Sequence, residues 1–275
     1  MIHMKIKHIK LENFRIFDKI EVDFVDFSIL TGTNGIGKTT LLGAVSLLCS
    51  SLDYNDPKRL KAYLGINIKH YGTSDQRPGF LAEALFEHEG KNYEVVLNQD
   101  GWVKNEILNE PFWFGGMTYF SSLDVDRQAF QLKLSLWPDF AKSYETIMGF
   151  SIDPDVYEDT MLKRIGEEAD IVTGFYLNKP QPQGRSRLSI ASGGEKKMAK
   201  ALAGIICLPK ERRPHIVFTD EIERQIDYRR HLVMMAEIQR IFEGTQVIAS
   251  THSETIRRDY EPKSNIIDLE KILGV

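Results

Sequence analysis

The chain has 275 residues, a length that suits one large domain or one domain with an inserted lobe. Hydrophobic residues make up 42% and charged residues 27%, so a sizeable core can form and disorder is not indicated. The formal net charge of −4 argues against a protein whose whole surface binds nucleic acid without specificity. It is compatible with a local basic groove.

Cysteine usage and hydropathy indicate a cytoplasmic protein. Cys49 and Cys207 each lie in an apolar, helix-like stretch, without the spacing of a disulfide framework or a metal site. We expect no signal peptide, because the N-terminal residues lack a continuous apolar region. The longest apolar run, residues 201–208, is far short of the ~20 residues that span a bilayer, so we expect no membrane partner.

The N-terminal third is predicted to be rich in strands. Alternating apolar residues predict a half-buried strand at 20–24 and a hairpin with strands at 82–86 and 93–97. The compact apolar run 27–30 predicts a buried strand, and residues 38–51 predict a helix.

The composition and hydrophobic pattern change twice in the rest of the chain. Residues 121–175 carry scattered charged stretches and two X-Pro pairs, and we predict an inserted, mostly helical lobe; residues 178–189 are predicted to form an exposed loop. Residues 176–275 then alternate buried strands, at 216–218 and 247–249, with amphipathic helices. This rhythm predicts an α/β fold with a largely parallel sheet, in a single domain of three parts, 1–120, 121–175 and 176–275.

One segment matches the phosphate-loop pattern G-x-x-x-x-G-K-[ST], and it comprises Gly32, Thr33, Asn34, Gly35, Ile36, Gly37, Lys38, Thr39 and Thr40. Its glycines let backbone N–H groups surround phosphate oxygens without Cβ clashes. Lys38 would neutralise the β- and γ-phosphates, and the Thr39 hydroxyl would ligate Mg²⁺. A helix that follows the loop points its positive end at the nucleotide, so the segment predicts a nucleotide site.

Carboxylates and a histidine follow two of the predicted buried strands. Asp220 and Glu221 end the strand at 216–218; Asp220 could hold Mg²⁺ through water, and Glu221 could polarise the attacking water as a general base. On its own, this pair could equally be a solvated acidic turn. His252 follows the strand at 247–249, where ligands gather in α/β sheets, and could bond to the γ-phosphate or position water.

A second anion site is predicted at Ser192, Gly193, Gly194 and Glu195, which open a helix. Two glycines expose backbone N–H groups at the positive end of that helix. A chain seldom builds two such sites for one nucleotide, so a dimer is the economical explanation, with this site capping the γ-phosphate held by its partner. An ordinary serine N-cap with a Gly-rich turn is the alternative.

In this order the motifs resemble the set found in ABC ATPases, over the chain as far as about residue 255. Residues 11–15 resemble the opening of RecF and SMC-type ATPases, and residues 220–223 and 246–253 resemble the small OLD-type and abortive-infection-type AAA ATPases of bacteria and phages. The resemblance implies an ABC-type ATPase head with a RecA-like parallel core, an N-terminal antiparallel β layer and the inserted helical lobe. It also places Arg15 near the nucleotide and gives Asp227 the position of the D-loop aspartate.

The resemblance leaves the metal ligands incomplete. A glutamine usually joins Thr39 and Asp220 around Mg²⁺, and Gln128 is the candidate here, with Gln76 a weaker one. The segment between the two halves lacks sustained heptads, so we expect no long coiled-coil arms.

The predicted function is an ATP- and Mg²⁺-dependent switch that dimerises around two ATP molecules, with Lys38, Glu221 and His252 as catalytic residues. To have a biological effect, this switch would act on an effector protein, such as a nuclease or toxin, or on DNA. Two alternatives stay open. A transporter's ATPase subunit is disfavoured by Ile222, where such subunits typically have Pro, and a nucleotide-gated scaffold with very slow turnover is disfavoured by Glu221.

Overall fold

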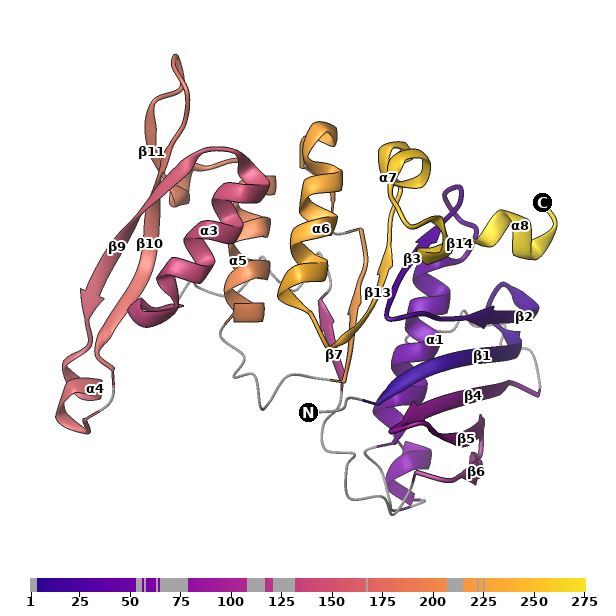
Figure 1. Ribbon diagram of the computed structural model, residues 1–275. Coiled ribbons are helices and arrows are strands. Elements are labelled where there is room, and N and C mark those ends of the chain that lie inside the picture. The colour runs from indigo at the N-terminus through magenta and orange to yellow at the C-terminus, as the bar shows by residue number, and fades with distance from the viewer. Residues whose placement is uncertain are drawn as a thin grey trace. The chain divides into compact units, whose positions relative to one another are not determined.

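The computed structural model (Figure 1) describes residues 4–52, 56, 58–62, 64, 79–107, 117–120, 132–166, 168–206, 215–221, 223–224 and 226–275. Cys207, Gln76, Gln128 and Ile222 lie outside these ranges. Contacts divide the chain into two compact units: unit 1 is Met1–Tyr119, Arg213–Ile222 and Gly244–Val275, and unit 2 is Phe120–Arg212 and Glu223–Glu243. The three-part division made from the sequence stays a prediction.

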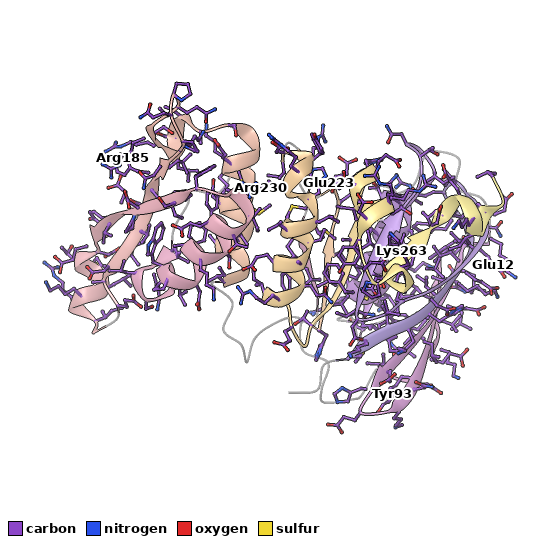
Figure 2. The ribbon with its side chains drawn as sticks, turned by 45° about the horizontal axis from the view of Figure 1, so that its top comes forward. Glu12, Tyr93, Arg185, Glu223, Arg230 and Lys263 are labelled. Atoms are coloured by element: carbon purple, nitrogen blue, oxygen red, sulfur yellow. The ribbon has the colours of Figure 1, made fainter. Side chains whose placement is uncertain are left out.

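Unit 1 contains an antiparallel sheet with the strand order β2-β1-β4-β5-β6. These strands are β1 (Lys5–Phe14), β2 (Phe17–Asp23), β4 (Leu81–His88), β5 (Lys91–Asn98) and β6 (Gly101–Asn105). Alternation puts Ala82, Ala84 and Phe86 into the core, as predicted for this hairpin. Charged residues alternate with them on the strands, and Glu12, labelled in Figure 2, forms an ion pair with Lys10.

A bulge in β1 adjusts which of its residues reach the core. The register against β4 shifts between Ile6 and His8. An extra residue at this point changes the alternation, so that Ile6 and Ile9 are both fully buried although they are not two residues apart.

The second sheet of unit 1 has the strand order β14-β3-β13-β12-β7. Its strands are β3 (Phe27–Thr31), β7 (Met117–Phe120), β12 (Ile216–Thr219), β13 (Gln246–Ser250) and β14 (Ile266–Asp268). The pairs β14–β3, β3–β13 and β13–β12 are parallel, which confirms the predicted parallel sheet. All residues of β3, β12 and β13 are buried, as expected for strands that are covered on both faces.

Helix α1 (Lys38–Ser51) packs against both sheets of unit 1. One hydrophobic cluster contains residues of β1, α1, β12 and β13, among them Ile9, Leu41, Phe218 and Ile248. The helix is apolar nearly all round because it is surrounded by core. The C-terminal part adds α7 (Glu254–Asp259), the 3₁₀ helix η6 (Lys263–Asn265) and, directly after β14, α8 (Leu269–Leu273).

Unit 2 combines an antiparallel sheet with helices. Its strands are β8 (Leu132–Lys133), β9 (Ser151–Glu158), β10 (Asp170–Asn178) and β11 (Arg185–Arg187), and β10 pairs with each of the other three. Its helices are α3 (Trp137–Met148), α4 (Thr160–Arg164), α5 (Gly193–Ile206) and α6 (His231–Ile241), with the 3₁₀ turns η2 (Leu134–Leu136), η3 (Leu188–Ile190) and η5 (Tyr228–Arg230). Helix α3 packs against both α5 and α6.

Aromatic side chains of α3 and β10 form the core of unit 2. The ring of Phe140 lies 5.5 Å from that of Phe175 and 5.4 Å from that of Trp137, and Tyr144 lies 5.2 Å from Phe175. Tilted and edge-on rings of this kind bury a large apolar area and fix the helix on the sheet. Helix α3 ends at Gly149, whose φ of 76° requires a glycine.

The structure adds strands to two segments of this unit. The described part of the lobe at 121–175 contains the expected helices, α3 and α4, and also the long antiparallel pair of β9 with β10. Its alternation is hidden in the sequence by a register shift between Val172 and Gly174 and by the acidic residues of β9. The exposed loop expected at 178–189 is shorter, because β11 pairs with β10 and its arginines stack on Tyr176.

Within the described residues, none of the helices is both long enough and apolar enough to cross a bilayer.

Candidate functional site

The phosphate loop of unit 1 needs its glycines for conformation and for space. Gly32, Gly35 and Gly37 have φ angles of 136°, 82° and 108°, which side chains strongly disfavour. A Cβ on Gly37 would lie 2.4 Å from Cζ of Phe17 and 2.7 Å from Cδ1 of Ile16. The turn between β1 and β2 therefore packs directly against the loop.

Arg15 lies in that turn, immediately before Ile16. Its backbone is left-handed, with a φ of 53°, and its side chain is half-buried. Because the neighbouring Ile16 contacts Gly37, the turn that carries Arg15 lies beside the phosphate loop. A role for Arg15 in nucleotide binding stays a prediction.

Lys38, the first residue of α1, directs its ammonium group back into the loop. Its Nζ donates to the carbonyl oxygens of Gly32, at 2.7 Å, and Thr33, at 3.0 Å. The residue is only 4% exposed. These carbonyls are neutral acceptors, whereas phosphate oxygens would form stronger, charge-assisted bonds with the same ammonium group.

Ser250, at the end of β13, connects the acidic residues that follow β12. Its hydroxyl bonds to Oδ1 of Asp220, and the backbone N–H of Glu221 donates to Ser250 Oγ at 3.1 Å. Thr39 Oγ1 donates to the other carboxylate oxygen, Asp220 Oδ2, at 3.0 Å. The loop, the acidic turn and the end of β13 are thus linked by hydrogen bonds.

Glu221 and His252 meet at the carboxyl ends of the parallel strands β12 and β13. His252 Nε2 lies 2.8 Å from Glu221 Oε1, and both side chains are partly exposed. Glu221 has a left-handed backbone with a φ of 47°, a conformation that is uncommon for a residue with a side chain and is often found at functional sites. Parallel strands bring their carboxyl ends to one edge, which is why these side chains converge.

The oxygen atoms of Thr39 and Asp220 fit a Mg²⁺ site. Mg²⁺ prefers oxygen ligands and is usually held by one or two protein groups, with water and phosphate oxygens completing its shell. Among the described residues, no group of three or more His, Cys, Asp or Glu side chains is placed to hold a metal by itself. The third expected ligand, Gln128, lies outside the described residues.

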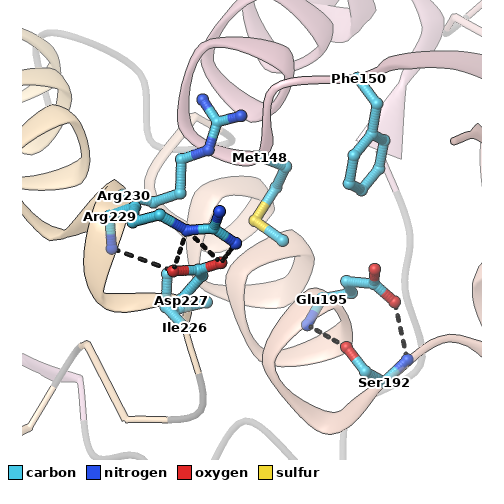
Figure 3. A pocket seen from close by; sticks show the side chains of 8 residues that line it. All are labelled: Met148, Phe150, Ser192, Glu195, Ile226, Asp227, Arg229 and Arg230. Carbon is cyan, nitrogen blue, oxygen red and sulfur yellow. Dashed lines mark hydrogen bonds and ion pairs between the residues drawn. The ribbon is translucent and has the colours of Figure 1, made fainter. Parts of the chain in front are cut away.

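Unit 2 contains a pocket with a volume of about 470 Å³ (Figure 3). It is lined by Met148, Phe150, Ser192, Glu195, Ile226, Asp227, Arg229 and Arg230. The pocket brings together Ser192, of the predicted second anion site, and Asp227, which the resemblance placed in the D-loop. Gly193 and Gly194 open α5 directly after Ser192.

Ser192 and Glu195 form a reciprocal cap at the start of α5. The N–H of Glu195 donates to Ser192 Oγ at 3.3 Å, and the N–H of Ser192 donates to Glu195 Oε2 at 2.7 Å. The second carboxylate oxygen of Glu195 lies 2.6 Å from Lys179 Nζ. Burial alone would raise the pKa of Glu195, but the bonds from Lys179 and Ser192 outweigh it, and the pKa is lowered.

Asp227 and Arg229 form a multidentate pair in the same pocket. Arg229 Nε lies 3.0 Å from Asp227 Oδ1 and 3.1 Å from Oδ2. Dashed lines in Figure 3 mark the bonds between these two side chains. The bonds from Arg229 lower the pKa of Asp227 to about 2, so this carboxylate is charged at neutral pH. Arg230 packs instead against Gly149, where a Cβ would lie 1.8 Å from its Nη2.

Three residues of unit 1 that the sequence analysis did not assign to the site also belong to it. Ser250 is fully buried. Its position at the end of an apolar strand was the feature of the sequence that could have indicated a role in the site. Arg257 and Glu270 bond to each other, and Glu270 also contacts Thr33 of the loop. No local pattern marks these two, because their contacts depend on the fold.

The comparisons with known proteins agree with this geometry. Residues 4–120 match a family model that describes an AAA ATPase domain. No curated protein matches the sequence. Similar solved structures, in contrast, cover nearly the whole chain.

Three of these structures are head domains of SMC proteins. The SMC head domain from Thermotoga maritima has a TM-score of 0.56 and 15% identity, over 94% of this chain and 92% of that one. An SMC head bound to the C-winged helix domain of ScpA has a TM-score of 0.63 and 15% identity, over 96% and 93%. An SMC head with an extended coiled coil, bound to the C-terminal domain of ScpA derived from Pyrococcus furiosus, has a TM-score of 0.55 and 13% identity, over 96% and 93%.

At these identities the likeness concerns the fold. It confirms the predicted α/β class, with the P-loop ATPase architecture of an SMC-type head.

Proposed function

We propose that the chain is an ATPase that acts as a nucleotide-driven switch. The observation that carries this proposal is the hydrogen-bonded set of Thr39, Asp220, Ser250, Glu221 and His252 beside the phosphate loop. The match of residues 4–120 to an AAA ATPase domain supports the same conclusion.

Binding of ATP would use the loop and the start of α1. Loop amides and the N-terminal end of α1 would surround the phosphates, and the Lys38 ammonium would exchange the carbonyls of Gly32 and Thr33 for phosphate oxygens. Thr39 and Asp220 would hold Mg²⁺, which supplies positive charge beside the phosphates when bound.

Hydrolysis would use Glu221 as the general base. Its carboxylate would accept a proton from water, the water oxygen would attack the γ-phosphorus, and the bond to the bridging oxygen would break to give ADP and phosphate. His252, at 2.8 Å, would hold the Glu221 carboxylate in position. Ser250 would fix the backbone of Glu221 and the carboxylate of Asp220 together.

The pocket of unit 2 would complete the site of a second copy. The cap at Ser192 uses Oγ as an acceptor, so its hydroxyl proton is still able to bond to a phosphate oxygen. The N–H groups at the start of α5 favour an anion at the same place. We therefore propose that Ser192, Gly193, Gly194, Glu195 and Asp227 contribute to the γ-phosphate site of a partner copy in an ATP-dependent homodimer.

The output of the switch would come from another molecule. Two of the similar SMC heads are bound to domains of ScpA, so heads with this fold can carry a partner protein. By analogy, we propose that the ATP-bound dimer controls an effector protein, such as a nuclease or toxin, or DNA, in DNA metabolism or anti-phage defence in the cytoplasm.

Mass in solution, measured by light scattering with and without ATP and Mg²⁺, tests this proposal. We expect Glu221→Gln, which should bind ATP without hydrolysing it, to be a dimer only when ATP is present. Adding Ser192→Arg should abolish that dimer, whereas adding Ser189→Arg, the same change at an exposed serine outside the pocket, should not. An unchanged mass with and without ATP would contradict the switch.

A further inference from the structure

We infer that Glu270 of α8 is a positioning residue for the phosphate loop, and that Arg257 of α7 holds Glu270 in place for this role. The inference rests on the proposed ATPase function and adds the C-terminal segment to its nucleotide site. All residues involved belong to unit 1.

The parallel pairing of β14 with β3 brings the C-terminal segment to the loop. Asp268 pairs with Thr31, the last residue of β3. Since both strands run in the same direction, the residues that follow Asp268 run beside the residues that follow Thr31. Glu270 consequently lies next to the start of the phosphate loop, and its Cγ is 3.7 Å from the position that a Cβ would occupy on Gly32.

One peptide group of the loop is bonded on both sides. The N–H of Thr33 donates to Glu270 Oε1 at 3.2 Å, and the carbonyl of Gly32, which belongs to the same peptide plane, accepts from Lys38 Nζ at 2.7 Å. In a planar trans peptide the N–H and C=O groups point in opposite directions. By holding the N–H, Glu270 therefore fixes the orientation of this peptide group, and with it the conformation of the start of the phosphate loop.

Arg257 holds the other side of the Glu270 carboxylate. Its Nη2 donates to Glu270 Oε2 at 3.0 Å and to Asp268 Oδ2 at 3.1 Å. Glu270 is 20% exposed and Asp268 is 12% exposed, so water screens this group only in part. The bonds from Thr33 and Arg257 lower the pKa of Glu270, so it is a carboxylate at neutral pH.

The same arginine extends the connection toward His252. Helix α7 begins at Glu254, with Ser253 as its N-cap, directly after His252. Arg257 lies on this helix, and its bond to Glu270 therefore links the segment that carries His252 to the loop that carries Lys38.

Arg257 also balances charge near the nucleotide. Without it, two carboxylates would stand beside a loop that has to accept a polyanion, and their repulsion would weaken ATP binding. Both residues should consequently act mainly on the affinity for ATP, because Glu270 bonds to the phosphate loop itself and Arg257 acts through Glu270.

The test is the affinity for ATP and, separately, the turnover rate of the full chain. We expect Glu270→Ala to weaken ATP binding about tenfold, as for the loss of one charge-assisted hydrogen bond, with kcat changed by less than about twofold. Glu270→Gln keeps an oxygen acceptor for the Thr33 N–H and should recover most of the affinity. Arg257→Ala should weaken binding by at least as much as Glu270→Ala.

Two comparisons make the result specific. In an Arg257→Ala background, Glu270→Ala should cost less affinity than in the wild type, because its side chain is no longer held in place. Arg258→Ala, which removes a neighbouring and mostly exposed arginine paired with Asp259, should leave affinity unchanged.

The outcomes separate this inference from the proposed function. Wild-type protein that fails to bind ATP overturns the ATPase itself. Wild-type protein that binds ATP while Glu270→Ala binds equally well overturns the positioning role alone, and so does a fall in kcat at unchanged affinity. Thermal unfolding of each variant identifies any variant that is not folded, in which case Glu270→Gln and Arg257→Ala decide the question.

Discussion

His252 Nε2 lies 2.8 Å from Glu221 Oε1. Glu221 follows β12 and His252 follows β13, so this contact connects the ends of two neighbouring parallel strands. The contact gives the carboxylate a fixed direction, and a general base has to be aimed at the water that it activates. We therefore expect the rate of hydrolysis to depend on His252, although Glu221 is the residue that accepts the proton.

We expect His252→Ala to lower kcat by about 10- to 100-fold, below the 10²- to 10⁴-fold contribution typical of a general base, since Glu221 stays in place. ATP affinity should change little, because Lys38 and the loop are untouched. His252→Gln keeps an N–H donor and should retain more activity than His252→Ala. Phosphate release and ATP binding measure the two effects, and equal turnover in both variants and the wild type would contradict the role of His252.

Ser250→Ala should reduce both stability and turnover. It removes the hydroxyl that bonds to Asp220 and accepts from the N–H of Glu221, and unpaired buried polar groups cost about 1–3 kcal/mol. Urea denaturation measures the loss of unfolding free energy, and phosphate release measures the loss of turnover.

Thr245→Val is the matched control for this prediction. Thr245 lies immediately before β13, the strand that ends at Ser250, and its buried hydroxyl has no hydrogen-bond partner among the described residues. Replacing that hydroxyl by a methyl group of the same shape should be neutral or stabilising. A similar loss of stability in both variants would show that the bonds of Ser250 are not responsible.

The parts of the site that the sequence predicts are those whose signal is local. The order of strand, glycine loop and helix from residue 27 to residue 51 predicts the phosphate loop. Each predicted buried strand likewise indicates that the polar residues at its end are candidates for the site. Ser250 needs the parallel register of β12 and β13 before its partners can be named. The contact between Thr33 and Glu270 joins residues that are 237 positions apart, and no pattern of hydrophobic residues along the sequence predicts such a contact.

The same distinction explains why the strands of unit 2 were not expected from the sequence. Strand β10 has its buried apolar residues at Val172, Phe175 and Leu177, and the shift of register near Gly174 makes their spacing look partly helical. The pairing with β9 is a tertiary fact, and it outweighs the local pattern. The fold class was predictable because the strands β3, β12 and β13 of the parallel sheet are regular and fully buried.

Gly37→Ala should abolish ATP binding and reduce stability. A left-handed alanine costs about 1–2 kcal/mol, and the added Cβ would in addition overlap Phe17 at 2.4 Å, so the loop or the β1–β2 turn has to move. Gly244→Ala separates the two effects, because its φ of 86° imposes the backbone cost at a position with no atom within 4 Å of the new Cβ. ATP affinity close to that of the wild type in Gly37→Ala would contradict the packing described for the loop.

Glu195→Gln should lower the free energy of unfolding at neutral pH by about 2 kcal/mol, the scale of a hydrogen bond to a charged group. Its pKa is lower in the folded protein than in the unfolded chain, so the carboxylate stabilises the fold fully at pH values above the unfolded pKa of 4.5. As pH falls from there through the folded pKa, the proton binds and this stabilisation is lost. Urea denaturation of both proteins from pH 7 to pH 3 should therefore show a difference that shrinks below about pH 4.5.

Glu158→Gln provides the comparison for this pH dependence. Glu158 also pairs with a lysine of unit 2, Lys163, but the two side chains are 52% and 65% exposed, and such surface pairs contribute about 0–1 kcal/mol. Its loss should barely change stability at any pH in this range. If Glu195→Gln behaves in the same way, the contacts of Glu195 with Ser192 and Lys179 contribute little to unit 2, and the pocket at the start of α5 does not depend on them for its shape.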